Sequence, residues 1–139
     1  MDEGAPLRFI GPVYEHVPEG FYSVVYVKHS VEKAFKGSHK LRVVFRIIDE
    51  GPCHAVELFW FCNVKKGNKS YQASQSSKLA RQLRILFGRD AVRGGPQLRR
   101  LKGKIFKART RTVARDSTNS LLHENNHYSV IDELMEIIS

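Results

Sequence analysis

Basic and aromatic residues are interleaved in this sequence, a combination suited to binding unpaired nucleic acid. Lysine and arginine can follow the phosphates of a strand, and flat rings can stack on unpaired bases at about 1–3 kcal/mol each. Phe35 stands between Lys33 and Lys36, and its ring can either stack on a base or fold back onto the core. The candidate binding residues are Lys33, Phe35, Lys36, Arg42, Arg46, Trp60, Lys65, Lys66, Tyr71, Lys107, Arg109 and Arg111.

The other aromatic candidates lie in two different surroundings. Tyr71 follows three lysines in the basic segment KKGNKSYQ, so we expect it at the surface. Trp60 lies in AVELFWFC, where both alternating faces are apolar. Either Trp60 or the pair Phe59 and Phe61 can therefore form the stacking surface.

The positive charge is concentrated in the middle of the chain. The 139 residues carry 23 Lys and Arg against 14 Asp and Glu, a net charge of +9. Residues 65–115 hold sixteen of the basic residues and one acid, whereas residues 116–139 hold five acids and no Lys or Arg. A solvated basic face would be the simplest explanation. Such concentration favours a groove that follows phosphates, with an affinity that falls steeply as salt is added.

Few of the residue types that serve catalysis and metal binding are spaced as in known motifs in this sequence. A two-metal nuclease needs several carboxylates in one site, and the scattered acids form no spaced motif for that chemistry. Cys53, His54 and Cys62 could bind zinc together with His123 or His127, but the two cysteines lack the C-x-x-C spacing of zinc and redox motifs. The segment GRDAVRGG lacks the lysine and following hydroxyl of a phosphate-binding loop. We therefore expect no enzyme activity, no cofactor and no metal.

Length and composition limit the class of protein. A chain of 139 residues with 42% hydrophobic and 27% charged residues is typical of one globular domain. Two cysteines are too few for a disulfide-rich secreted scaffold, which favours a reduced, cytoplasmic setting. No apolar run approaches the roughly 18 residues of a membrane span, and the N-terminus MDEGAPLRFIG does not resemble a signal peptide. We expect neither membrane association nor export.

The spacing of apolar residues predicts several short strands and one helix. Alternation predicts strands over residues 20–28, 41–48, 55–62 and 101–113. A helical period predicts a helix over 74–87, capped by Ser74, Ser76 or Ser77 and ended by Gly88. Residues 1–16 are expected to form an arm, and residues 89–100 and 114–127 loops. Residues 128–139 fit a strand or a helix, and we expect a strand over the first half followed by an acidic and apolar tail.

Alternation also predicts which side chains face outward. On the second strand, Arg42 and Arg46 lie opposite a core face made of Leu41, Val43, Phe45 and Ile47. On the fourth, one face carries Lys107, Arg109 and Arg111. Three like charges on one strand face are costly unless solvent or an anion covers them.

The order of elements predicts a mostly β fold. Three strands, a helix and two further strands fit a five-stranded OB-like barrel with one α-helix between strands 3 and 4, forming a single domain over residues 1–139. Such a barrel leaves a binding face on strands 2 and 3 with the loops beside them.

Three segments resemble the single-stranded DNA-binding proteins of phages and mobile elements that use one OB fold per chain. They are VPEGFYSVVYVKHSVEKAFKGSHKLRVVFRIIDEGPCHAVELFWFCNV, SSKLARQLRILFG and LKGKIFKARTRTV, and the resemblance is one of pattern over residues 17–135. It implies coating of single-stranded DNA during replication or recombination, with strand contacts from Phe35, Arg42, Arg46, Trp60, Lys107, Arg109 and Arg111. Bacterial housekeeping proteins of this type end in an acidic tip closing with Pro-Phe, whereas this chain ends ELMEIIS. Its acidic C-terminal segment can still contact replication or recombination proteins, or compete with DNA.

We therefore expect a non-enzymatic protein that binds single-stranded DNA largely independently of sequence. The alternative is a protein-interaction or inhibitor module on an OB barrel, with an incidental basic surface. RNA binding, duplex binding and a homo-oligomeric state all remain compatible with the sequence.

Overall fold

Six strands, one α-helix and two short 3₁₀ helices make up the described part of the chain. A computed structural model describes residues 7, 15–33, 38–93, 97–115, 120–123 and 126–139. The strands are β1 (Phe21–Lys33), β2 (His39–Ile47), β3 (Glu57–Lys66), β4 (Tyr71–Gln72), β5 (Ile105–Val113) and β6 (Tyr128–Ile137). The helices are α1 (Lys78–Phe87), η2 (Arg89–Val92) and η3 (Leu98–Leu101).

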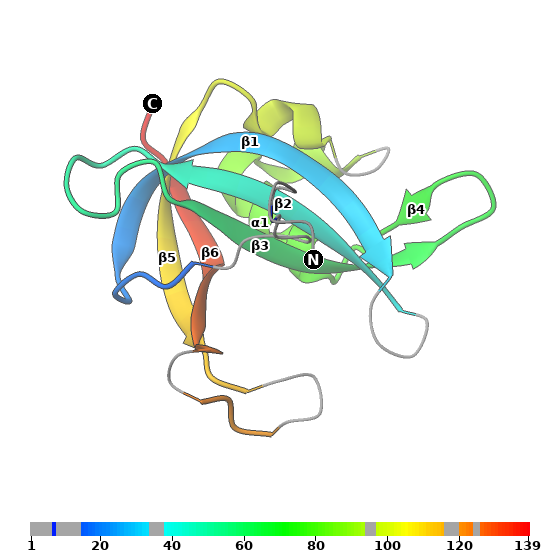
Figure 1. Ribbon diagram of the computed structural model, residues 1–139. Helices are drawn as coiled ribbons and strands as arrows, with labels where there is room; N and C mark the ends of the chain where they lie inside the picture. Colours follow the sequence, from blue (N-terminus) through cyan, green and yellow to red (C-terminus); the bar gives the residue numbers. More distant parts are fainter. Residues whose placement is uncertain (1–6, 8–14, 34–37, 94–96, 116–119, 124–125) are drawn as a thin grey trace.

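Five of the strands close into a barrel (Figure 1). β1 pairs antiparallel with both β2 and β5, β2 pairs with β3, and β5 pairs with β6. A parallel pairing of β3 with β6 at Phe59 and Val130 completes the ring. With α1 between β3 and β5, the prediction of a mostly β, five-stranded OB-like barrel is confirmed.

Aromatic and branched side chains fill the barrel. The predicted core face of β2 is confirmed, because Leu41, Val43, Phe45 and Ile47 are all buried. Phe45 lies at the centre, with edge contacts to Trp60 at 6.2 Å and Phe106 at 6.0 Å between ring centroids. These inward faces leave the alternate residues of β2 and β3 on the outside of the barrel.

Helix α1 begins and ends where the local sequence provides caps. The Ser77 hydroxyl accepts a hydrogen bond from the Ala80 amide at 3.2 Å, and Gly88 ends the helix with a φ of 89°. The helix buries Leu79 and Leu83 against the barrel. Its buried Gln82 accepts a hydrogen bond from the Leu134 amide of β6 at 2.6 Å, which fastens the helix to the last strand.

The C-terminal strand is longer than predicted. β6 runs through residue 137, so residues 132–137 are part of the barrel rather than a tail. Register shifts in the pairing of β5 with β6 explain why its apolar spacing fits a helix as well as a strand. They place both Ile131 and Leu134, three residues apart, in the core.

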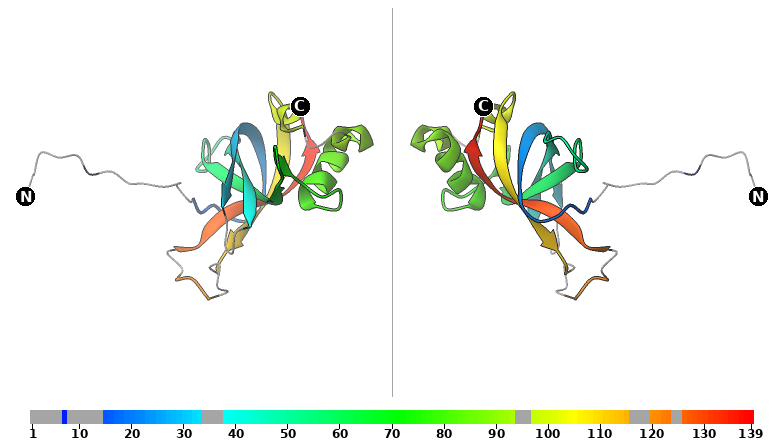
Figure 2. Two further views of the ribbon diagram at one scale, coloured as in Figure 1. Left: turned by 90° about the vertical axis from the view of Figure 1, so that its right-hand side faces the viewer. Right: turned by 90° about the vertical axis from the view of Figure 1, so that its left-hand side faces the viewer.

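A hairpin extends from one end of the barrel. β3 continues past its partners and turns back into β4, with Lys65 opposite Gln72 and Lys66 opposite Tyr71. Gly67 permits this tight turn, because a Cβ at Gly67 would lie 2.7 Å from the Ser70 carbonyl oxygen. In Figure 2, α1 lies on the side of the barrel away from β1 and β2.

Candidate nucleic-acid interface

The outer face of β2 and β3 carries a pair of phenylalanine rings beneath basic side chains. The register places Phe61 opposite Arg42 and Phe59 opposite Val44. The two rings meet edge to face, with centroids 5.8 Å apart. The Arg42 guanidinium lies 5.0 Å from the Phe59 ring centroid, and the Lys40 ammonium lies 5.9 Å from that of Phe61. Such cation–π contacts keep charge and ring together on one surface.

Trp60 does not belong to this surface. Its side chain is completely buried and points into the core with Phe45. The prediction that Trp60 stacks on bases is wrong for this structure, because a sealed ring offers no face to a ligand. Phe59 is only 8% exposed, so Phe61, which is half-buried, is the ring of this strand that reaches solvent.

The two arginines of β2 have carboxylate partners on neighbouring strands. Arg46 donates two hydrogen bonds to Glu57 of β3, the shorter 2.8 Å long. Arg42 lies 3.4 Å from the carboxylate of Glu32 on β1. Both arginines face outward as predicted, but part of their charge is already offset within the protein.

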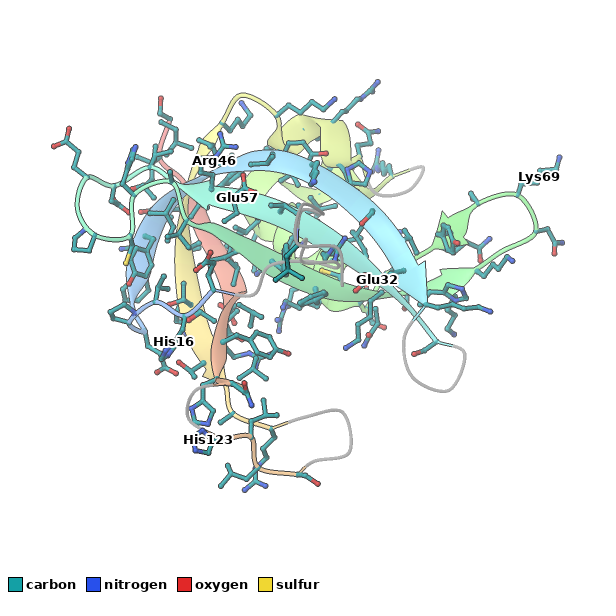
Figure 3. All side chains as sticks on the ribbon, in the orientation of Figure 1. His16, Glu32, Arg46, Glu57, Lys69 and His123 are labelled. Carbon is teal, nitrogen blue, oxygen red and sulfur yellow. The ribbon has the colours of Figure 1, made fainter. Side chains whose placement is uncertain are left out.

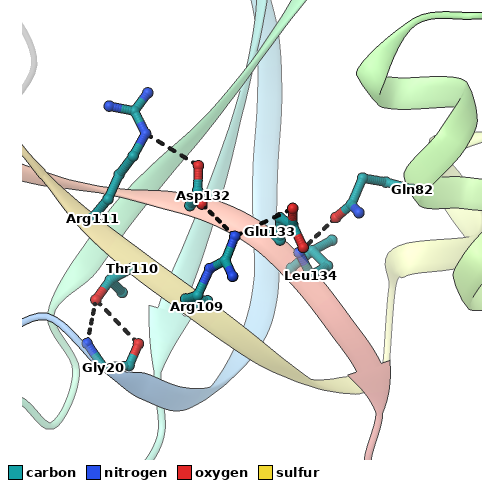
Figure 4. Close-up of polar contacts among 8 residues, drawn as sticks. All are labelled: Gly20, Gln82, Arg109, Thr110, Arg111, Asp132, Glu133 and Leu134. Atoms are coloured by element: carbon teal, nitrogen blue, oxygen red, sulfur yellow. Dashed lines mark hydrogen bonds and ion pairs between the residues drawn. The ribbon is translucent and has the colours of Figure 1, made fainter.

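The arginines of β5 are offset more strongly, by acids of β6 (Figure 4). Arg109 lies 2.7 Å from Asp132 and 3.3 Å from Glu133, and Arg111 lies 3.2 Å from Asp132. Partial burial raises the pKa of Asp132, but the hydrogen bond and charge of Arg109, together with Arg111, outweigh it and hold the pKa below its usual value. The anion that the like charges of β5 require is therefore supplied by the protein itself.

Lys107, the third basic residue of β5, has an aromatic neighbour instead. Its ammonium lies 4.9 Å from the ring centroid of Phe21, which is 57% exposed on β1. Half-buried Lys107 and exposed Phe21 thus form a second pair of cation and ring. This pair lies where β1 meets β5, whereas Phe61 lies on β3 beside β2.

Five exposed lysines gather at the end of the barrel from which the hairpin extends. We call Lys33, Lys40, Lys65, Lys66 and Lys69 the lysine cluster. The strand register brings them together, since Lys33 pairs with His39, His39 with Val64, and Lys40 with Asn63. Figure 3 shows Lys69 at the tip of the hairpin, far from the labelled acids. Among the described residues, none of the five has a carboxylate within 4.0 Å.

An exposed ring accompanies the lysine cluster. Tyr71 is 46% exposed, as predicted, and its ring lies 5.4 Å from that of His39. His39 was not among the predicted residues, because only the pairing of β3 with both β2 and β4 brings it to Tyr71. Two further predicted residues, Phe35 and Lys36, lie outside the described part of the chain.

A shallow pocket of about 540 Å³ opens on the same outer face, between β1, β2 and β3. Val44 and Phe59 supply apolar lining, and Lys28, Arg42 and His54 face it together with Glu15 and Glu57. Its mixed charges offer no concentrated attraction for an anion. The lysine cluster is the more favourable place for phosphate.

His123 and His127, with Glu124, have the H-E-x-x-H spacing that binds zinc when both histidines share a helix face. Neither His123 nor His127 lies in an α-helix here, and His127 Nε2 is 3.1 Å from the Leu122 carbonyl oxygen. Within the described ranges, no three His, Cys, Asp or Glu residues are grouped as metal ligands.

Comparisons of the chain with protein-family models, curated proteins and solved structures found no match. No helix in the described part of the chain is long and apolar enough to cross a membrane. The function must therefore be inferred from the geometry of the site.

Proposed function

We propose that this protein binds single-stranded DNA without enzymatic activity and largely without regard to sequence. The observation that carries the proposal is the lysine cluster beside the half-buried ring of Phe61 and the exposed ring of Tyr71. The cations lack carboxylate partners among the described residues, so polyanion binding displaces no ion pair from them. The rings supply the stacking surfaces that unpaired bases require.

Single strands fit this arrangement better than a duplex. Bases in a duplex already stack on their neighbours, so they gain nothing from a protein ring unless they are unstacked first. The flat faces of Phe61 and Tyr71 add affinity only for unpaired bases. The strand would lie across β2 and β3 and continue along the hairpin, rather than along β5, whose arginines are held by Asp132 and Glu133.

The cellular setting rests on the resemblance of the sequence to phage and mobile-element proteins. We propose a role in replication or recombination of such an element, in the cytoplasm. Contact with replication or recombination proteins through the described part of the acidic C-terminal segment would use acids of β6 that face solvent. Glu136 is exposed, whereas Asp132 and Glu133 are engaged with Arg109.

The direct test is a titration of a fluorescently labelled oligo-dT followed by anisotropy, at about 50 and 200 mM salt. Trp60 emission is a poor reporter because the ring is buried. We expect binding that weakens steeply with salt and is competed by oligo-dT more strongly than by oligo-rU or duplex. Absence of binding at low salt would refute the proposal and favour a protein-interaction module.

Two matched ring variants test the position of the site. Tyr71→Ala should weaken binding by about 5- to 150-fold, the equivalent of one base stack of about 1–3 kcal/mol, with an unchanged salt dependence. Phe21→Ala removes a ring of similar exposure that also accompanies a lysine, but lies at the start of β1 where that strand pairs with β5. It should bind like the parent. Equal losses in both variants would contradict this placement.

A further inference from the structure

A second basic surface lies on the helix side of the barrel. Residues 78–104 carry nine Lys and Arg against the single acid Asp90. Five of the nine are exposed in α1, in the 3₁₀ helices and at their ends. We call these five the helix-side surface: Arg81, Arg89, Arg93, Arg99 and Lys102.

The packing of each short element explains why these charges point outward. α1 buries Leu79, Ala80, Gln82 and Leu83 against the barrel, which leaves Arg81 on the opposite face. Ala91 of η2 and Leu101 of η3 are completely buried. Their neighbours in the sequence, Arg89, Arg99 and Lys102, are therefore turned to solvent.

These charges are scarcely neutralised by the protein. Asp90 is 3.4 Å from Arg93, but both side chains are more than 80% exposed, so solvent screens the pair. Two half-buried arginines beside the surface bond neutral groups within the described ranges. Arg84 donates to the Gln75 carbonyl oxygen at 2.9 Å, and Arg100 to the Gln97 side chain at 3.1 Å. On β5, by contrast, two acids offset the charge of the arginines. The helix-side surface therefore keeps more of its positive charge than β5 does.

The helix-side surface lies on the side of the barrel away from β1 and β2 (Figures 1 and 2). α1 touches β3 at its first residue, where Lys78 donates to the Phe61 carbonyl oxygen at 3.4 Å, but Lys78 is not one of the five residues of the surface. A short strand lying across β2 and β3 would leave the helix-side charges uncovered. The five residues that define the helix-side surface are all Arg or Lys, so they offer charge and no ring on which a base could stack.

We propose that the helix-side surface binds the phosphates of a second DNA strand, so that one chain holds two single strands at once. This inference rests on the proposed single-strand function and adds strand bridging to it. Each cation that meets a phosphate releases a counterion, which drives association independently of base sequence. Holding two polyanions on one protein offsets their mutual repulsion and raises the concentration of each near the other.

The test uses biotinylated oligo-dT of about 15 nucleotides, near the upper site size of one OB fold. The oligomer is fixed to beads and loaded with protein, and a fluorescent oligo-dT is then added. We expect the second oligomer to be retained only when protein is present. Loading of protein without retention of the second oligomer would refute the bridging inference and leave the proposed function standing. No loading of protein at all would refute the proposed function itself.

A pair of triple variants separates the two surfaces. The helix-side triple variant is Arg81→Gln, Arg89→Gln and Arg99→Gln; its matched control, the hairpin triple variant, is Lys65→Gln, Lys66→Gln and Lys69→Gln. Both remove three exposed positive charges, so the net charge of the two proteins is equal. A urea titration of each confirms folding before binding is measured.

The helix-side triple variant should bind the first oligomer within about twofold of the parent but retain the second about 10- to 100-fold less well. The hairpin triple variant should already lose affinity for the first oligomer. If bridging survives in the helix-side variant, the second strand is held by another copy of the chain, and the inference is wrong.

Discussion

Replacing Asp132 with asparagine should destabilise the fold while strengthening DNA binding. Asp132 bridges Arg109 at 2.7 Å and Arg111 at 3.2 Å, with its side chain 31% exposed. Partly exposed ion pairs contribute about 0.2–1 kcal/mol each, so loss of the Asp132 carboxylate should lower the free energy of unfolding by about 1 kcal/mol. For a chain of this size the Tm should fall by about 3–5 °C.

The effect on binding has the opposite sign. Arg109 keeps Glu133 at 3.3 Å, whereas Arg111 is left without a carboxylate within 4.0 Å among the described residues. If the freed cation meets a phosphate, log K should fall more steeply with log salt, by about 0.7. Over a tenfold increase in salt, the affinity of the variant should therefore fall by about fivefold more than that of the parent. Urea unfolding and oligo-dT anisotropy measure the two effects separately.

The dependence on pH gives a further check on Asp132. Its pKa is depressed in the folded protein by Arg109 and Arg111, against the opposing effect of partial burial. The carboxylate therefore stabilises the fold fully above its unfolded pKa of about 3.9 and loses this effect as the pH falls through the folded value. The stability difference between parent and Asp132→Asn should vanish in that acidic range.

Asp90→Asn is the matched control for stability, because it makes the same charge change on a highly exposed pair with Arg93. It should leave the Tm unchanged within error and should not release Arg111. If Asp132→Asn is as stable as the parent, or binds oligo-dT no more tightly than the parent, the reasoning about the β5 arginines is refuted.

Three other predictions concern the core. Emission from buried Trp60 should resist quenching by acrylamide and by saturating oligo-dT; strong quenching by DNA would show that the ring is accessible. Gln82→Leu leaves the Leu134 amide without its hydrogen-bond acceptor, which lies 2.6 Å away, and should lower the free energy of unfolding in urea by about 1–3 kcal/mol. A loss of stability no greater than that of exposed Gln72→Leu would contradict this. Burial raises the pKa of Cys62 to about 12, so at about pH 8 a thiol reagent should modify only Cys53 rapidly, and rapid modification of two thiols would contradict the burial.

Local patterns predict most of the fold. The alternation of Leu41, Val43, Phe45 and Ile47 identifies a strand with one buried face, and serine and glycine at the two ends identify the helix. These features depend on residues close together in the chain. The full length of β6 is less predictable, because its register shifts against β5 place Ile131 and Leu134 together in the core.

The binding site is harder to predict because it depends on pairing between distant residues. The sequence shows an excess of acid after residue 116, but only the register of β5 with β6 places Asp132 on Arg109 and Arg111. Likewise, both faces of the strand containing Trp60 are apolar, so alternation alone does not say which face is enclosed. The curvature that closes the barrel decides this.

The salt dependence of oligo-dT binding by the hairpin triple variant tests the central claim most directly. If Lys65, Lys66 and Lys69 each meet a phosphate, their loss should reduce the slope of log K against log salt by about 2, at about 0.7 per contact. The helix-side triple variant, with the same net charge, should keep the slope of the parent. A hairpin variant whose slope equals that of the parent would contradict the proposal that the strand follows the lysine cluster.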